Sequence, residues 1–248
     1  MLTSHLARLG LVCAACLAGG RAAPRLELRF ALHTETTGAG ADLLEGILGC
    51  PGCQAEYPVI DGVPVVVPDL GGWAVRGLDA ALRRHDVSPL LERLLAGVVP
   101  ADTPAGRALD AISTVVGAHW GDRQIGAEVA PAGSFARRCA GAIAALPSPP
   151  RGPWLALRCA AGRAAFLLAE AGADLAIGVD LDLTLLRRAE QGRRTGRVEW
   201  LARAAGGAFA PALAEVGALP RERVGFLCAD PGALPIEAST FAALSIDG

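Results

Sequence analysis

The pattern of apolar and polar positions divides the chain into three segments. In residues 1–70, β-like runs at 25–33 and 57–70 are interrupted by glycine and proline, which favours a small β unit. In residues 71–150, apolar positions recur three and four residues apart, as in amphipathic helices. In residues 151–248, short apolar runs alternate with helical stretches. We therefore expect three units with these boundaries, the middle one being a helical bridge.

The helical bridge is predicted from the residues at helix starts as well as from the spacing. Thr103 and Ser134 are favoured N-cap residues, and Pro104 stands in a first turn, where proline is tolerated. The Pro-rich stretch 147–153 marks the end of the bridge. The expected helices cover residues 75–86, 88–99, 103–120 and 134–146.

The last segment shows the order strand, helix, strand, helix, which calls for a parallel sheet with right-handed crossovers. We therefore assign the fold class as α/β. Buried strands are expected at 154–159, 175–182, 223–230 and 240–248, and a strand or hairpin at 197–204. Helices are expected at 162–172, at 183–192 with Gly192 as the cap, and at 208–219.

Composition and charge exclude several classes of function. The formal net charge of −2 provides no general basic field for nucleic acid, which we do not expect as a partner. No apolar run reaches the roughly 18 residues of a membrane span, so we expect no membrane contact. The apolar N-terminus has the outline of a signal peptide, but Cys13 and Cys16 within it have partners further along. We therefore expect a cytoplasmic location.

Two pairs of cysteines form the most specific motif. Cys13 and Cys16 make one CxxC, and Cys50 and Cys53 make another. Two residues between cysteines let a tight turn point both thiolates at one ion, and two such turns complete a tetrahedral sulfur site, typical of zinc. Four thiolates leave no open position for water, so the expected Zn2+ is structural. The alternatives are unrelated buried thiols or a redox pair.

The residues around the second pair resemble a known family. Leu43–Glu45, Cys50–Cys53, Tyr57–Pro58 and Asp61–Pro64 stand in the same order in small zinc-ribbon proteins that activate methyltransferases acting on tRNA and release factors. They are also similar to ribbons fused to bacterial methyltransferases. The resemblance implies a zinc ribbon in residues 1–70 that contacts protein, since few cations accompany its apolar strands.

Landmarks in the last segment resemble class I S-adenosylmethionine-dependent methyltransferases. "ALRCAAGR", residues 156–163, stands where that family has a strand end and a loop of the type D-L-G-C-G-x-G. Asp180 in "GVDLD" and Asp230 in "ADPGALP" follow in the family's order. The resemblance implies a partial Rossmann-like sheet with S-adenosylmethionine as cofactor, Asp180 on the ribose hydroxyls and Asp230 facing the adenine amino group. The implied cofactor-binding residues are Arg158, Cys159, Gly162, Asp180, Leu181 and Asp230.

The loop departs from the family pattern at three positions. Ala156 replaces an acid, and Arg158 and Ala160 replace glycines. Glycine permits positive φ and close backbone approach to a ligand. The Arg158 side chain would either occupy the space of the cofactor or pair with its methionine carboxylate, and the sequence leaves both readings open.

The last predicted strand raises the question of a partner. The chain supplies about four of the family's seven strands, so the fourth would form an apolar edge that invites a protein. Asp247 is the polar candidate near it.

His119 and Trp120 would either line an entrance or pack as a helix end on the core. Cys139, Cys159 and Cys228 are expected to be inert buried thiols, Cys159 despite its place in the loop motif.

Two hypotheses follow. The first is an S-adenosylmethionine-dependent methyltransferase-like protein acting on an unknown small-molecule or protein acceptor. The second is a non-catalytic or truncated methyltransferase homologue whose zinc ribbon, or exposed sheet edge, serves as an interaction module for a protein partner.

Overall fold

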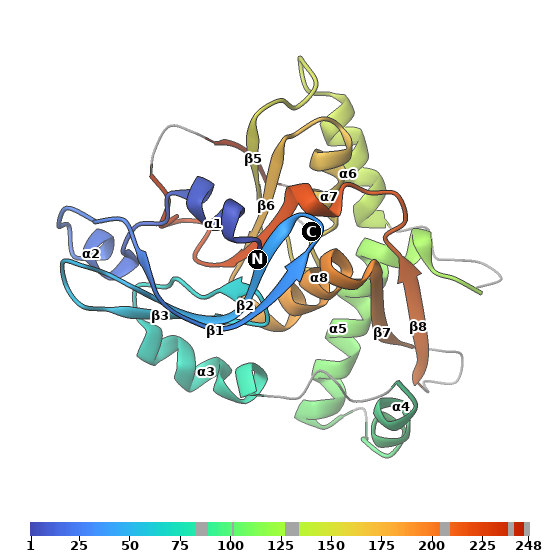
Figure 1. Cartoon of the computed structure of the whole chain (residues 1–248). Coiled ribbons are helices and arrows are strands. Elements are labelled where there is room, and N and C mark those ends of the chain that lie inside the picture. The colour runs from blue at the N-terminus through green and yellow to red at the C-terminus, as the bar shows by residue number, and fades with distance from the viewer. Residues whose placement is uncertain (83–88, 101, 127–133, 204–208, 238–240, 246–248) are drawn as a thin grey trace.

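The computed structural model describes residues 1–82, 89–100, 102–126, 134–203, 209–237 and 241–245 (Figure 1). It shows a mixed α/β fold, with an antiparallel sheet in the N-terminal part, helices in the middle and a parallel sheet in the C-terminal part. Within these ranges, no helix is both long and apolar enough to cross a membrane.

The N-terminal part consists of two short helices followed by an antiparallel sheet with the order β1-β2-β3-β4. The expected run at 57–70 forms β3 and β4, joined by a turn in which Asp61 and Gly62 both have positive φ. The apolar pattern does not predict β2, because glycines interrupt its alternation. The elements are α1 (Thr3–Leu9), α2 (Ala14–Ala18), β1 (Glu27–Thr37), β2 (Gly40–Gly49), β3 (Glu56–Ile60) and β4 (Val63–Pro64).

The bridge is helical, as its spacing predicts. The Thr103 hydroxyl accepts a hydrogen bond from the Gly106 N–H at 3.1 Å, and Pro104 is the first residue of α5. Residues 83–88, at the junction of the first two expected helices, lie outside the described ranges. The elements are α3 (Leu70–Leu82), α4 (Pro89–Gly97), α5 (Pro104–Trp120), the 3-10 turn η1 (Gly121–Arg123) and α6 (Ser134–Ala144).

The C-terminal part is built on a parallel sheet with the order β10-β5-β6-β9. The strands form where the buried apolar runs predict them. Helix α7 connects β5 to β6, and α8 followed by the β7–β8 hairpin connects β6 to β9. Their carboxyl ends consequently meet at one edge. The elements are β5 (Pro153–Leu157), α7 (Arg163–Glu170), β6 (Leu175–Asp180), α8 (Leu183–Thr195), β7 (Arg197–Arg203), β8 (Phe209–Glu215), η3 (Arg221–Arg223), β9 (Val224–Cys228) and β10 (Ala242–Ser245).

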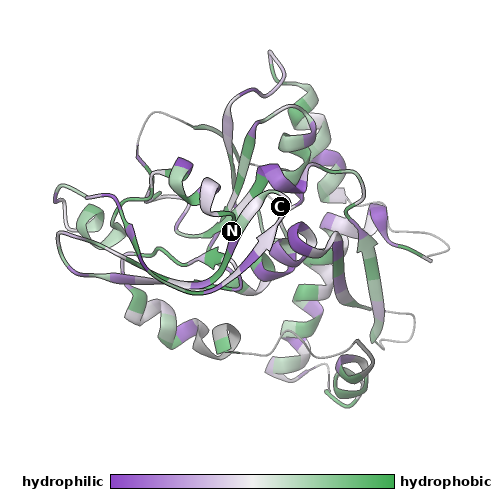
Figure 2. Cartoon of the chain, viewed as in Figure 1, coloured by the Kyte–Doolittle hydropathy of each residue, from purple (hydrophilic) through white to green (hydrophobic). Residues whose placement is uncertain are grey.

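The helix predicted at 208–219 is wrong. Residues Phe209–Glu215 instead form β8, which pairs antiparallel with β7 from Arg203↔Phe209 to Arg197↔Glu215. Pro211 cannot donate a backbone hydrogen bond within a helix, and the alanines of this stretch hide its β alternation from a helical reading. Figure 2 shows β8 to be largely hydrophobic, in contrast to the hydrophilic α8.

The end predicted for α8 is also wrong. The helix passes through Gly192 and ends at Gly196, which has a φ of 78°. Gly192 serves packing instead, because a Cβ at this position would lie 2.7 Å from Cγ2 of Val198. A glycine in the last turn of an apolar pattern therefore marks a close contact here rather than the helix end.

Both faces of the parallel sheet are covered. Alternate residues of a strand point to opposite faces, so Ala156 and Phe226 belong to one core cluster, while Leu155 and Leu227 belong to another. Helices α5 to α8, the β7–β8 hairpin and the chain at and after β4 supply the first cluster. The N-terminal helices and the antiparallel sheet supply the second, through residues that include Met1, Leu9, Leu11, Leu43 and Tyr57.

The N-terminal part also bonds directly to the parallel sheet. The Val66 N–H donates to the Cys228 carbonyl at 2.9 Å, so the chain after β4 runs beside β9. A buried ionic cluster adds a second link, because Arg193 of α8 pairs with Asp42 of β2 and with Glu190. The first and third segments thus share a core, and the division of the chain into three units stays a prediction.

Candidate functional site

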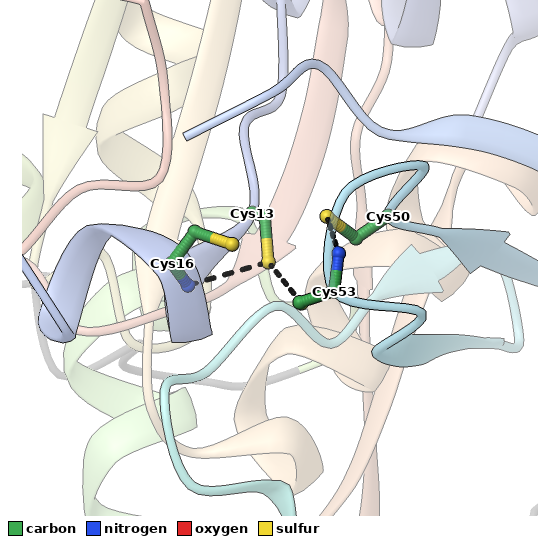
Figure 3. A group of neighbouring side chains, drawn as sticks. All are labelled: Cys13, Cys16, Cys50 and Cys53. Atoms are coloured by element: carbon green, nitrogen blue, oxygen red, sulfur yellow. Dashed lines mark hydrogen bonds between the residues drawn. The ribbon is translucent and has the colours of Figure 1, made fainter. Parts of the chain in front are cut away.

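The four cysteines of the two CxxC motifs lie together (Figure 3). Their sulfur atoms all fall within 4.8 Å of one another, and those of Cys13 and Cys53 are 3.5 Å apart. Sulfurs around a tetrahedral zinc with Zn–S bonds of about 2.3 Å are separated by about 3.8 Å, so the cluster fits this ion. The structure brings together all four predicted ligands, in a geometry that fits a zinc ribbon.

Each CxxC turn stabilises its own first sulfur. The Cys16 N–H donates to the Cys13 Sγ at 3.4 Å, and the Cys53 N–H donates to the Cys50 Sγ at 3.4 Å (Figure 3). Hydrogen bonds of this kind favour the thiolate, which is the form that binds metal. The matched geometry of the two turns supports one four-thiolate site rather than four separate thiols.

Tyr57 belongs to the residues that carry the zinc-ribbon resemblance, but the CxxC spacing does not reveal its contact with the cluster. Its hydroxyl lies 3.3 Å from the Cys13 Sγ and accepts a hydrogen bond from the Ala15 N–H at 3.0 Å. Burial raises the pKa of Cys13, but the Tyr57 and Cys16 hydrogen bonds outweigh it and lower that pKa to about 7. Burial and the neighbouring thiols raise the pKa of Cys16 to about 12.

A second site lies at the carboxyl ends of β5, β6 and β9. Here the structure contains a hollow of about 580 Å³. Four of the six residues predicted from the methyltransferase resemblance line it, namely Arg158, Asp180, Leu181 and Asp230. The remaining described lining residues are Leu157, Pro231 and Gly232.

The loop after β5 has the backbone conformation that glycine favours. Arg158, Ala160 and Gly162 have φ values of 54°, 44° and 82°, although only the last is glycine. A side chain in this left-handed region costs about 1 kcal/mol or more. The Ala160 N–H donates to Oδ2 of Asp180 at 2.8 Å, which ties the loop to the end of β6. The loop thus combines a backbone conformation that favours glycine with non-glycine side chains at positions 158 and 160.

Asp180 and Asp230 each order a turn at the rim of the hollow. The Asp182 N–H donates to Oδ1 of Asp180 at 3.0 Å, and the Gly232 N–H donates to Oδ1 of Asp230 at 2.8 Å. Both carboxylates also belong to the lining of the hollow, so each combines a local structural bond with a position at the hollow.

Cys159 and Gly162 lie on the core side of the loop and are not among the lining residues. A Cβ at Gly162 would come within 2.5 Å of Cβ of Ala189 and 2.7 Å of Cε1 of Phe226, so glycine is required for packing. Burial raises the pKa of the Cys159 thiol well above its usual value. Both residues shape the loop without facing the hollow.

The end of the helical bridge supports the same loop. The Trp120 indole N–H donates to the Ala161 carbonyl at 2.8 Å, and Arg163 pairs with Asp122 at 3.1 Å. His119 stacks on Phe135 with ring centroids 3.9 Å apart. His119 and Trp120 are buried, as expected for a helix end packed on the core. No sequence motif signals Arg163, whose partners come from a distant segment.

Comparison with known proteins gives no family. No family model matches the chain, and no curated protein matches it. The assignment of the cysteine cluster and the carboxyl-end hollow as candidate sites therefore rests on the geometry described above. The candidate Asp247 lies outside the described residues.

Proposed function

We propose that this chain is a class I S-adenosylmethionine-dependent methyltransferase-like protein with a structural zinc ribbon, acting on a small-molecule or protein acceptor. One observation carries the proposal: Asp180 and Asp230, at the ends of neighbouring strands, line one hollow of about 580 Å³. Ligand pockets commonly have volumes of about 300–1,000 Å³. The hollow is therefore large enough for an adenosyl ligand.

The strand order supports this proposal. Numbered in chain order, the parallel strands β5, β6, β9 and β10 have the spatial order 3-2-1-4. Doubly wound nucleotide-binding sheets have this order, and their ligands lie outside the carboxyl ends of the strands. The hollow occupies this position.

Different residues of the chain would bind different parts of the ligand. Asp180 would accept hydrogen bonds from the ribose hydroxyls, and Asp230 would accept one from the adenine amino group. Leu181, which is 47% exposed, offers apolar contact beside them. The bound sulfonium supplies an electrophilic methyl group, while the protein contributes alignment of the acceptor.

The zinc ribbon has a structural role in this proposal. A closed four-thiolate site has no free coordination position for substrate or water. Its strands instead cover one face of the parallel sheet, so metal binding would stabilise the sheet whose strand ends form the hollow.

The second candidate function is an interaction module without catalysis. It is favoured by Ala156, which is buried where the family has an acid, and by the side chains at two left-handed loop positions. Within the described residues, β10 pairs only with β5 and so leaves an edge at which a protein partner could bind.

Titration calorimetry with S-adenosylhomocysteine distinguishes the two functions. We expect micromolar binding to the zinc-loaded protein, lost in Asp180→Ala. The matched control is Asp174→Ala, since Asp174 lies at the opposite end of β6 in an exposed pair with Arg8. Thermal unfolding of each variant checks that it folds. Absence of binding at millimolar ligand would favour the interaction module.

A further inference from the structure

Charged side chains stand in a row across the strand ends of the hollow. Leu157 of β5 pairs with Val179 of β6, so Arg158 and Asp180 come next on adjacent strands. Asp230 follows the end of β9, the next strand in the sheet. Neighbouring strands are about 4.8 Å apart. Across β5, β6 and β9, the charges are therefore positive, negative and negative.

This order of charges matches the order of groups along an adenosyl ligand. The proposed function places adenine at Asp230 and ribose at Asp180. The amino-acid part is attached to the other side of the ribose, so it would extend toward the end of β5. Among the described residues that line the hollow, Arg158 carries the only positive charge.

The loop conformation at Arg158 points to a role for its side chain. A glycine would adopt the φ of 54° without strain, yet the position carries a long cationic side chain at the hollow. The Cys159 N–H to Val179 carbonyl bond, at 3.1 Å, and the Trp120 bond to Ala161 hold the backbone around it. Backbone strain that the surroundings maintain is concentrated at ligand sites.

We propose that the Arg158 guanidinium binds the carboxylate of the ligand and makes the hollow selective for adenosyl ligands that carry one. This inference rests on the proposed function. A guanidinium and a carboxylate form two parallel hydrogen bonds, a strong and directional contact. The arginine thereby replaces backbone contacts that a loop with three glycines would offer.

The test compares two ligands by calorimetry on the zinc-loaded full chain. The first is S-adenosylhomocysteine, and the second is its decarboxylated form, which differs only in lacking the carboxylate. We expect the first to bind about 10- to 100-fold more tightly. Arg158→Gln should remove this difference by weakening S-adenosylhomocysteine alone, whereas Arg151→Gln, which precedes β5, should retain it.

A second variant, Arg158→Gly, relieves the backbone strain and so provides a folded protein without the cation. It should bind both ligands equally and more weakly than the wild type binds S-adenosylhomocysteine. If Arg158→Gly binds S-adenosylhomocysteine as well as the wild type does, or more tightly, the inference is overturned and the proposed function stands. If wild type and variants all fail to bind either ligand, the proposed function fails together with the inference.

Discussion

The cysteine cluster and the carboxyl-end hollow differ in what defines each site. In the cluster, every side chain that the chemistry needs is present, and the two CxxC turns bring the sulfurs together. In the loop at the hollow, Arg158, Ala160 and Gly162 all have positive φ, although only the last is glycine. The first site is thus defined by residue identity and the second by backbone conformation. A motif search detects the first kind of site far more readily than the second.

The largest effect is expected at the cluster. Cys50→Ser should abolish binding of about one zinc per chain and unfold the N-terminal sheet, because structural zinc contributes on the order of 10 kcal/mol in small zinc domains. Metal analysis and circular dichroism measure both results. Cys139→Ala removes a buried thiol outside the cluster and should retain the zinc. Full zinc content in Cys50→Ser would contradict the assignment.

The next effect tests the link between the two regions. Arg193→Met should lower the free energy of unfolding by about 3 kcal/mol, because it leaves Asp42 and Glu190 as buried carboxylates without their guanidinium. Arg25→Met breaks an exposed pair with Glu237, which solvent screens, and should lower the free energy of unfolding much less. Urea denaturation compares the variants, and equal losses would show that the buried cluster does not join the regions.

Acid should destabilise the fold through two buried histidines, His5 of α1 and His119 of α5. Burial lowers the pKa of His5 to about 4 and that of His119 to about 3. The unfolded chain, with histidine pKa values near 6.5, binds these protons first, so stability falls as pH decreases from about 6.5 toward 4.

At pH 5, each buried histidine should lower the free energy of unfolding by about 2 kcal/mol. His5→Gln and His119→Gln should each flatten the dependence of unfolding free energy on pH, measured by urea denaturation between pH 5 and 7. His33→Gln on the exposed strand β1 is the control and should leave the slope unchanged. An unchanged slope in both buried variants would contradict this account.

The smallest effect concerns the loop itself. Arg158→Gly and Ala160→Gly should each stabilise the protein by about 1 kcal/mol, because glycine accepts positive φ without strain. Ala161→Gly, at the buried neighbour without positive φ, should destabilise it by a similar amount. Thermal unfolding ranks the variants. Destabilisation by both glycine substitutions at 158 and 160 would show that the loop does not have this conformation.

Patterns local in sequence predicted much of the structure. The CxxC spacing identified the cluster, and the buried runs located β5, β6 and β9, because a strand and a metal turn depend on residues close in the chain. β8 was predicted as a helix because alanine fits both periodicities and Pro211 alone opposed that reading.

Contacts between distant segments could not be predicted in this way. The bond from Val66 to Cys228 and the pair of Asp122 with Arg163 join residues that no periodicity relates. The covering of the parallel sheet by the N-terminal part, and the support of the loop by Trp120, depend on such contacts. Sequence therefore identified the candidate residues of the hollow, while the fold determined which of them face it.

We propose that the strand ends of β5, β6 and β9 hold an adenosyl ligand. A crystal structure of the zinc-loaded protein grown with S-adenosylhomocysteine tests it most directly. We expect the ribose at Asp180, the adenine at Asp230 and the carboxylate at Arg158. A hollow without ligand at saturating concentration, or a ligand bound elsewhere on the chain, would contradict it.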